Sequence, residues 1–257
     1  MASDDNDRMR EAIERLYGVF SAYKLHEHVA GCTHCVSDRD HARIHRAPLR
    51  ELTGDDLERY AFKAMTTWGT ANDFRHFLPR IFELIARDPW DPIVAEVAVG
   101  KLSEGKWTSW PSEEQVAIRE FLHAWWLETL SQFPLTIFFD ADKCLCCIGQ
   151  AVDDLGDFLN EWRIDSIRAH ALHFAEFIQS NGAVRPKKTR RLLASAFWHD
   201  RPQSEASVIR WLTHPARAEE VERAFFKFEA GNEEEAAMLS CSLGYLSTIC
   251  AAAGGTA

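Results

Sequence analysis

Long hydrophobic runs are missing from this sequence of 257 residues. No apolar stretch reaches the roughly 18 residues that a membrane-spanning helix needs, and the first residues are acidic where a secretory signal would be basic and then apolar. Cations are also scarce, because 29 Lys and Arg face 39 Asp and Glu and leave a formal net charge of -10. We therefore expect a soluble, cytoplasmic protein with no membrane partner, and the acidic balance argues against nonspecific binding of nucleic acid.

Signatures of common enzyme classes are absent as well. The sequence has no P-loop, no G-x-S-x-G and no glycine-rich phosphate cradle, so nucleotide-dependent and hydrolase chemistry lose their usual sequence anchors. Cysteine is present, but seven is an odd number in a chain without an export signal. We therefore expect reduced thiols and no disulfide framework.

The apolar residues that are present favour helices. Leu and Ala supply 55 residues while Val and Ile supply 24, a balance that suits helices better than sheets. Met9, Ile13 and Leu16 recur at helical spacing and predict a first helix. Thr followed three residues later by Asp, at 53–56 and at 70–73, has the outline of a capping box. Two further helices are therefore predicted to begin near residues 54 and 71.

The rest of the chain continues in short helices. Punctuation by Pro, Gly and Asn predicts them over 92–105, 112–133, 140–162, 165–180, 187–198, 204–213, 215–229 and 233–252. Pro79 is expected to kink or restart the helix that contains it. The sequence therefore predicts an all-α fold, an irregular stack of about ten antiparallel helices with some likeness to a helical-repeat array. We expect a single domain over 1–257, with a weak division near 134–140.

The densest cluster of metal-ligating side chains lies in a predicted polar loop at 26–48. Five of the eleven histidines and two cysteines gather there. The spacing Cys32-x2-Cys35-x5-His41-x3-His45 offers four ligands for a closed, structural Cys2His2 zinc site. His28 and the other histidines of the loop are spare candidates. An unliganded loop and a redox or catalytic thiol are the alternatives, since C-x-x-C alone is a common pattern.

The remaining cysteines and acids have plainer explanations. Cys144, Cys146 and Cys147 lie in an apolar stretch and are expected to be small buried hydrophobes, as are Cys241 and Cys250. The segment 135–142 resembles the strand and D-x-D opening of haloacid-dehalogenase-like phosphatases, but Lys-Cys-Leu replaces the expected Gly-Thr-Leu. Asp140 is therefore interpreted as a helix N-cap. His170 and His173 are interpreted as a satisfied or solvated pair and not as a metal site.

Aromatic and basic residues supply the candidate contact points. Trp90, Trp107 and Trp110 fall on predicted loops, where an indole ring can anchor a partner or can staple the start of a helix. The basic run 185–191 holds five cations in seven residues. It could attract a phosphate backbone or an acidic partner, or it could be a solvated helix start.

One resemblance extends over about the first ninety residues. Cys32-x2-Cys35, then Pro48-Leu49-Arg50-x-Leu52, then Trp68-Gly69, then Asp73-Phe74-Arg75-His76-Phe77-Leu78-Pro79-Arg80 resembles a set of bacterial helical proteins that share this order of motifs. The resemblance implies that the cysteine pair and the Phe-Leu-Pro-Arg segment belong to one structural unit. The sequence is also loosely similar to small helical proteins found beside bacterial conflict systems. Neither resemblance implies an activity.

Two functional hypotheses follow. The first is a non-enzymatic recognition or regulatory protein that binds a protein partner, for example an acidic antitoxin or immunity-type protein masking a basic face. The second is a metal-dependent or thiol enzyme that uses the segment 26–48.

Overall fold

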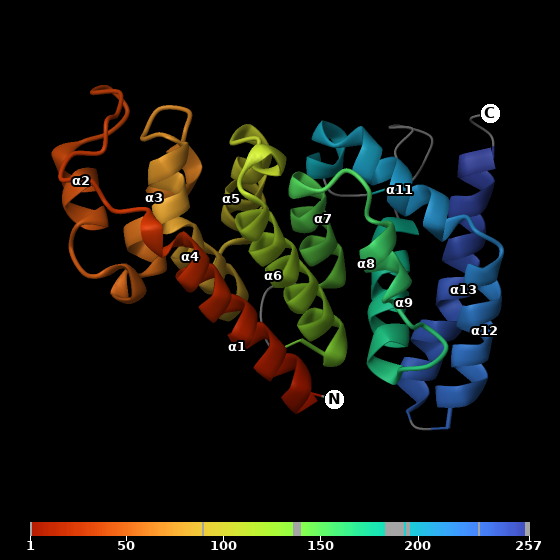
Figure 1. Cartoon of the computed structure of the whole chain (residues 1–257). Helices are drawn as coiled ribbons and strands as arrows, with labels where there is room; N and C mark the ends of the chain where they lie inside the picture. The colour runs from red at the N-terminus through yellow and green to blue at the C-terminus, as the bar shows by residue number, and fades with distance from the viewer. Residues whose placement is uncertain are drawn as a thin grey trace. The chain divides into compact units, whose positions relative to one another are not determined.

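The structure is a computed structural model of the whole chain (Figure 1). It describes residues 2–88, 90–135, 140–182, 193, 196–230 and 232–254. Within these ranges there are twelve α-helices, four 3-10 helices, two isolated β-bridges and no strand. The prediction of an all-α fold is confirmed. Among the helices described, none combines the length and apolar character required to cross a bilayer.

The chain divides into two compact units, Met1–Trp125 and Trp126–Ala257, with the boundary inside one long helix. Each unit has its own set of buried side chains and is described separately. The expectation of one domain over 1–257, with a weak division near 134–140, stays a prediction.

Unit 1 is built around the helix α4 (Ala71–Arg87), which packs against α1 and α3. The inward residues of α4 are aromatic and aliphatic, and Phe77 and Ile81 have no exposed surface. The remaining elements of this unit are α1 (Ala2–Val19), η1 (Phe20–Ala22), α2 (Asp38–Ile44), η2 (Leu49–Glu51), α3 (Gly54–Lys63), α5 (Pro92–Glu104), η3 (Trp107–Ser109) and the first part of α6 (Ser112–Ser131).

Unit 2 has an aromatic core centred on Trp162, whose ring lies 5.2 Å from that of Trp126 and 5.5 Å from that of Trp211. The indole N–H groups are satisfied, because Trp126 donates to the carbonyl of Phe158 and Trp162 to that of His170. The elements of this unit after α6 are α7 (Ala141–Ala151), α8 (Gly156–Asn160), α9 (Arg168–Gly182), η4 (Ala196–Asp200), α11 (Pro202–Leu212), α12 (Ala216–Phe228) and α13 (Glu233–Gly254).

The predicted helix starts are confirmed where a side chain caps them. Thr53 and Thr70 form capping boxes with the Asp three residues later, and Asp140 accepts the amide hydrogen of Lys143 at 2.8 Å. Each of these acceptors satisfies an N–H that the first turn of a helix leaves unpaired.

Several local predictions are corrected by the structure. Pro79 lies inside α4, so no new helix starts there, and the alternative of a kink stays a prediction. The loop at 26–48 contains the helix α2, which begins at a third capping box, from Ser37 to Asp40. The predicted helix 140–162 is broken between α7 and α8. Cys241 and Cys250 are exposed, whereas the three cysteines of α7 are buried as expected.

Candidate functional site

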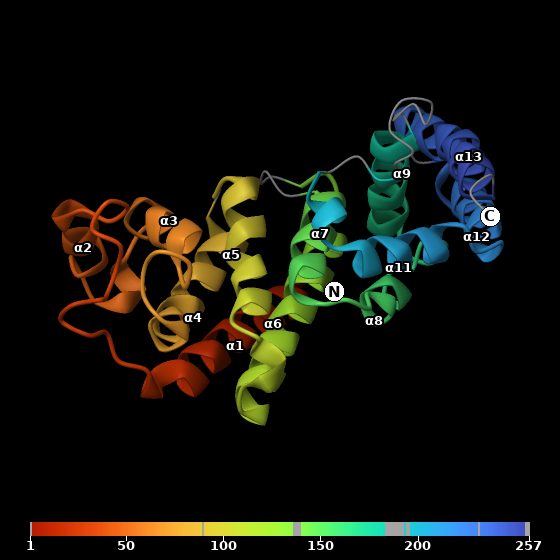
Figure 2. The same ribbon diagram turned by 90° about the horizontal axis from the view of Figure 1, so that it is seen from above.

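The Cys-x-x-Cys segment forms a tight turn at one end of unit 1, beside α2 and α3 (Figures 1 and 2). The amide nitrogen of Cys35 lies 2.9 Å from the carbonyl oxygen of Cys32, which closes the turn. Cys32 is exposed and Cys35 is partly buried. The turn therefore presents one thiol to solvent and keeps the second beneath it.

Several polar groups close to the Cys32 sulfur favour its charged form. They are the backbone amide of His34, the thiol and the backbone amide of Cys35, and the charge of Lys63. These groups favour the thiolate over the thiol, so they lower the pKa of Cys32 below its ordinary value.

A backbone bridge and one arginine hold the turn in place. The backbone around Gly31 forms a β-bridge with the segment that follows α3. In it the amide of Cys32 donates to the carbonyl oxygen of Thr67 at 2.8 Å. Arg59 of α3 donates to the carbonyl of Cys35 at 3.0 Å and lies 2.9 Å from Asp40. Gly31 is required by space, because a Cβ there would lie 3.2 Å from the buried Trp68 ring. The turn is thus fixed by α3 and not by its own sequence alone.

The histidines of the same segment do not gather round the cysteines. His41 stacks on His28, with 4.9 Å between ring centroids, and meets the edge of Trp68 at 5.3 Å. Burial, then the charges of His28 and His45, lower the pKa of His41. His45 directs its two ring nitrogens at the carbonyls of His41 and His26, at 2.8 and 2.9 Å. A neutral imidazole carries one N–H, so one of the two His45 nitrogens can donate to its carbonyl, and the tautomer decides which one.

The predicted zinc ligands are therefore only partly brought together. Cys32 and Cys35 share one turn, His41 lies with His28, and His45 is engaged by backbone oxygens. In the part of the chain that the structure describes, no three His, Cys, Asp or Glu side chains form a group that could hold a metal ion. The Cys2His2 zinc site stays a prediction.

The three tryptophans predicted as partner anchors are buried. Trp90, Trp107 and Trp110 are 7%, 3% and 5% exposed. Trp110 donates its indole N–H to the carbonyl of Gly105 at 2.8 Å, while the Trp90 ring lies against the start of α3. The Trp110 bond reaches the C-cap of α5 and not a helix start, so the interpretation of these rings as staples of helix starts stays a prediction. Their role as partner contacts stays a prediction. The basic run 185–191 lies outside the described residues.

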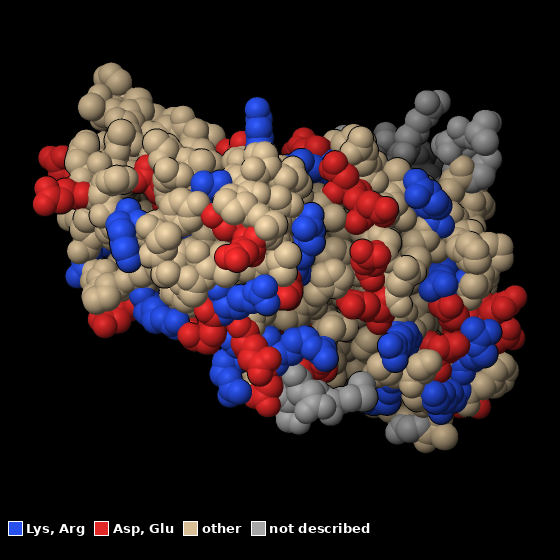
Figure 3. Space-filling view, in the orientation of Figure 1, with Lys and Arg blue, Asp and Glu red and all other residues tan. Residues whose placement is uncertain are grey.

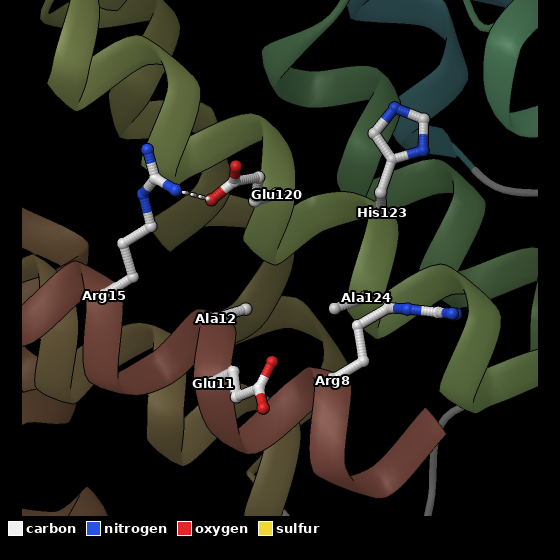
Figure 4. A pocket seen from close by; sticks show the side chains of 7 residues that line it. All are labelled: Arg8, Glu11, Ala12, Arg15, Glu120, His123 and Ala124. Atoms are coloured by element: carbon white, nitrogen blue, oxygen red, sulfur yellow. Dashed lines mark ion pairs between the residues drawn. The ribbon is translucent and has the colours of Figure 1, made fainter. Parts of the chain in front are cut away.

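The surface offers two shallow hollows away from the cysteines. One of about 340 Å³ lies between α1 and α6, where Ala12 and Ala124 face each other and Arg15 pairs with Glu120 at 3.0 Å (Figure 4). Lys and Arg side chains are intermixed with Asp and Glu on the face shown in Figure 3. Neither sign of charge therefore forms a continuous field there.

The second hollow, of about 200 Å³, lies in unit 2. Arg217 lies 4.6 Å from the centre of the Trp211 ring and 2.6 Å from a Glu220 oxygen. Burial lowers the pKa of Arg217 and raises that of Glu220. The two charges neutralise each other, so we interpret Arg217 and Glu220 as a structural ion pair.

The residues of this site that sequence reasoning missed are Arg59 and Lys63. They follow the cysteine pair by more than twenty residues, and the capping box at the start of α3 was the nearest local signal. No protein-family model, no curated protein and no solved structure matches the chain.

Proposed function

We propose that the protein carries out thiol–disulfide exchange, with Cys32 as the attacking thiol and Cys35 as the resolving thiol. One observation carries the proposal: the exposed Cys32 and the partly buried Cys35 share a turn, which the Cys35 amide closes by donating to the Cys32 carbonyl at 2.9 Å. The groups around Cys32 also lower its pKa, which favours the thiolate. A thiolate held this way is the nucleophile that disulfide exchange requires.

The turn supplies the geometry for closure. A chain reversal with this amide-to-carbonyl bond keeps the first and fourth Cα atoms within about 7 Å, and a disulfide needs roughly 4.4–6.8 Å between them. Cys32 and Cys35 can therefore join with small local adjustment.

The reaction balances with a substrate disulfide as the oxidant. The Cys32 thiolate attacks one substrate sulfur, a mixed disulfide forms, and the other substrate sulfur leaves as a thiolate. Cys35 then loses its proton to solvent and attacks the Cys32 sulfur, which releases the second substrate thiolate. Two electrons pass from the dithiol to the substrate, and a small thiol such as glutathione can reduce the new Cys32–Cys35 disulfide.

This proposal is the thiol version of the second sequence hypothesis, and it needs fewer groups than a zinc site or a tryptophan docking surface. A four-ligand zinc site requires His45 to leave its two carbonyl partners. Docking through tryptophans requires buried rings to emerge. The exchange reaction uses the two sulfurs where they already lie.

Redox titration of the full chain tests the proposal. Protein equilibrated in glutathione buffers of graded potential is acid-quenched, alkylated and analysed by peptide mass spectrometry. We expect one two-electron transition for the Cys32–Cys35 peptide, and for Cys35→Ser a persistent mixed disulfide of Cys32 with glutathione. Cys241→Ser, which removes an exposed thiol elsewhere, is the matched control and leaves the transition unchanged.

An activity assay completes the test. With dithiothreitol as reductant, wild-type protein is expected to accelerate reduction of a fluorescent disulfide peptide, and Cys32→Ser to lose at least about tenfold of that rate. A pair that stays reduced at every potential, or a Cys32→Ser rate equal to wild type, would contradict the proposal.

A further inference from the structure

The segment 29–32, which ends at Cys32, pairs along one side with the turn that follows α3. Gly31 and Trp68 form an antiparallel β-bridge there. The two hydrogen bonds of this bridge run from the Gly69 amide to the Ala30 carbonyl at 2.7 Å and from the Cys32 amide to the Thr67 carbonyl at 2.8 Å. They flank Gly31 and do not use its own polar groups.

The backbone groups of Gly31 face the other way. In an antiparallel pair, a residue whose two neighbours make the bonds directs its own N–H and C=O to the opposite side. Within the described residues, neither of these Gly31 groups has a hydrogen-bond partner. Gly31 is also exposed, and because glycine has no side chain, its exposed surface is backbone. The segment 29–32 therefore has an open edge, which can pair with another chain.

The bridge partner of Gly31 has no such open edge. The N–H of Trp68 donates to the carbonyl of Lys63 at 3.1 Å, and its C=O accepts the amide hydrogen of Met65 at 3.0 Å. Trp68 thus lies between Gly31 and Ala64, with which it forms a second bridge. A further strand can be added on the Gly31 side of this arrangement.

The side chains of the segment alternate as in extended chain. Val29 is buried and Ala30 is exposed. The Cβ position of Gly31 faces inward, 3.2 Å from the Trp68 ring, and Cys32 is exposed again. Alternation of this kind follows from the pleat. The Cys32 side chain therefore lies on the solvent side, one residue from the open backbone groups of Gly31.

An added antiparallel strand would bring one of its residues opposite Cys32. The strand residue opposite Gly31 would exchange two hydrogen bonds with it, and the residue before that one would lie opposite Cys32 in a pair without hydrogen bonds. The Cα atoms of such a pair are about 4.5 Å apart, and a disulfide needs roughly 4.4–6.8 Å. A cysteine at this position of the strand therefore has its sulfur within reach of Cys32.

We propose that the substrates of the thiol exchange are extended polypeptide segments with a cysteine disulfide, which dock antiparallel on the open edge of the segment 29–32. This substrate class rests on the proposed function of Cys32 and Cys35. The residue that follows the substrate cysteine pairs with Gly31. Because backbone groups supply the bonds, the edge selects extended chain and not a particular side chain.

Kinetics with N-methylated peptides test the docking. Each short peptide has one cysteine, linked by a disulfide to nitrothiobenzoate, whose coloured thiolate is released when Cys32 attacks. The reduced protein carries Cys241→Ser and Cys250→Ser, which remove the other exposed thiols. Rates are divided by those with dithiothreitol, which corrects for the intrinsic reactivity of each disulfide.

Methylation at two neighbouring amides gives a matched pair of substrates. N-methylation of the residue after the cysteine removes the N–H that the Gly31 carbonyl would accept, so we expect the corrected rate to fall at least about tenfold. N-methylation of the cysteine itself is the control. Its N–H faces away from the edge, so the rate is expected to stay within about twofold of that for the unmethylated peptide.

Hydrogen exchange gives a readout that does not need catalysis. In the same background with Cys35→Ser added, Cys32 is joined chemically to the unmethylated peptide or to mercaptoethanol, and exchange of the Gly31 amide is followed by NMR. We expect this amide to exchange at least about tenfold more slowly in the peptide adduct, because it is then hydrogen-bonded to the peptide.

Three results would overturn the docking: equal corrected rates for the two methylated peptides, a loss confined to the peptide methylated at its cysteine, which indicates parallel pairing, or equal exchange of the Gly31 amide in the two adducts. Hydroxyethyl disulfide, which has no amide group, separates this failure from that of the exchange reaction. A protein that reduces it while any of these results is found keeps the proposed function and loses the docking. A protein that reduces neither disulfide contradicts the proposed function, and with it the substrate class.

Discussion

Arg59 donates a hydrogen bond to the carbonyl oxygen of Cys35 at 3.0 Å. The same guanidinium lies 2.9 Å from Asp40, the acid that caps α2. One side chain of α3 therefore fixes both the end of the cysteine turn and the helix that follows it. The resolving thiol is positioned by a residue far from it in the sequence.

Removing this link should hinder closure of the turn. We expect Arg59→Met to lower the equilibrium constant for forming the Cys32–Cys35 disulfide against glutathione by about three- to tenfold, because the turn would sample more open shapes. Its cost to folding stability should stay below about 1 kcal/mol, since the Arg59 side chain is half exposed. Arg39→Met, on the exposed side of α2, is the control. Equal constants for wild type and Arg59→Met would show that Arg59 does not position the turn.

The reactivity of Cys32 should rise at a lower pH than that of an ordinary thiol. The pKa of Cys32 is lowered, so its thiolate persists to a pH at which a free thiol is protonated. The rate of alkylation by iodoacetamide, followed at the Cys32 peptide, is expected to reach half its maximum at a lower pH than that of a free cysteine peptide measured alongside. Lys63→Met should move this midpoint upward, and Lys63→Arg should restore it. An equal midpoint in wild type and Lys63→Met would contradict the electrostatic part of the explanation.

A zinc-binding measurement distinguishes two models: a site formed by the two cysteines alone and the predicted four-ligand Cys2His2 site. We expect added zinc to bind through Cys32 and Cys35 alone, so that His45→Ala leaves the affinity within about twofold while Cys32→Ser abolishes binding. Competition with a zinc-sensitive chelating dye measures this directly. A loss of about tenfold or more in both His45→Ala and His41→Ala would instead support the Cys2His2 site.

Local patterns in the sequence carried the fold class and the helix starts. The capping boxes at Thr53 and Thr70 need only residues three apart, and Asp140 needs only the amide of Lys143. No new helix starts at Pro79, because a helix can retain a proline when tertiary packing supports it, and the neighbouring Leu78 is fully buried.

Only the cysteine pair of the candidate site could be predicted from the sequence. The spacing of Cys32 and Cys35 showed that two sulfurs could meet. Whether histidines would join them depended on long-range packing, since His41 meets Trp68 across twenty-six intervening positions and His45 turns to a backbone carbonyl at His26. Contacts of this kind have no local sequence signal, and neither does the exposure of Cys241, which depends on which face of α13 meets α9.

The buried His170 should make unit 2 sensitive to acid. Its ring accepts the amide hydrogen of Arg163 at 3.1 Å, and burial lowers its pKa from 6.5 to about 4. Between these two pH values the unfolded chain binds a proton that the folded chain excludes, so the free energy of unfolding falls as the pH is lowered through this window. At 1.36 kcal/mol per pKa unit, the loss amounts to about 3 kcal/mol at most.

His170→Gln isolates this effect, because its amide oxygen can still accept the Arg163 N–H while nothing titrates. Urea unfolding at pH 7 and near pH 4.5 gives the loss of stability for each protein. We expect wild type to lose about 2–3 kcal/mol more than the variant between these two conditions. Titrating groups that do not interact with His170 are common to both proteins and cancel in the difference. His173 is the exception, because its charge contributes to the lowered pKa of His170. Equal losses would mean that His170 takes up its proton in the folded chain, and hence that its ring reaches water.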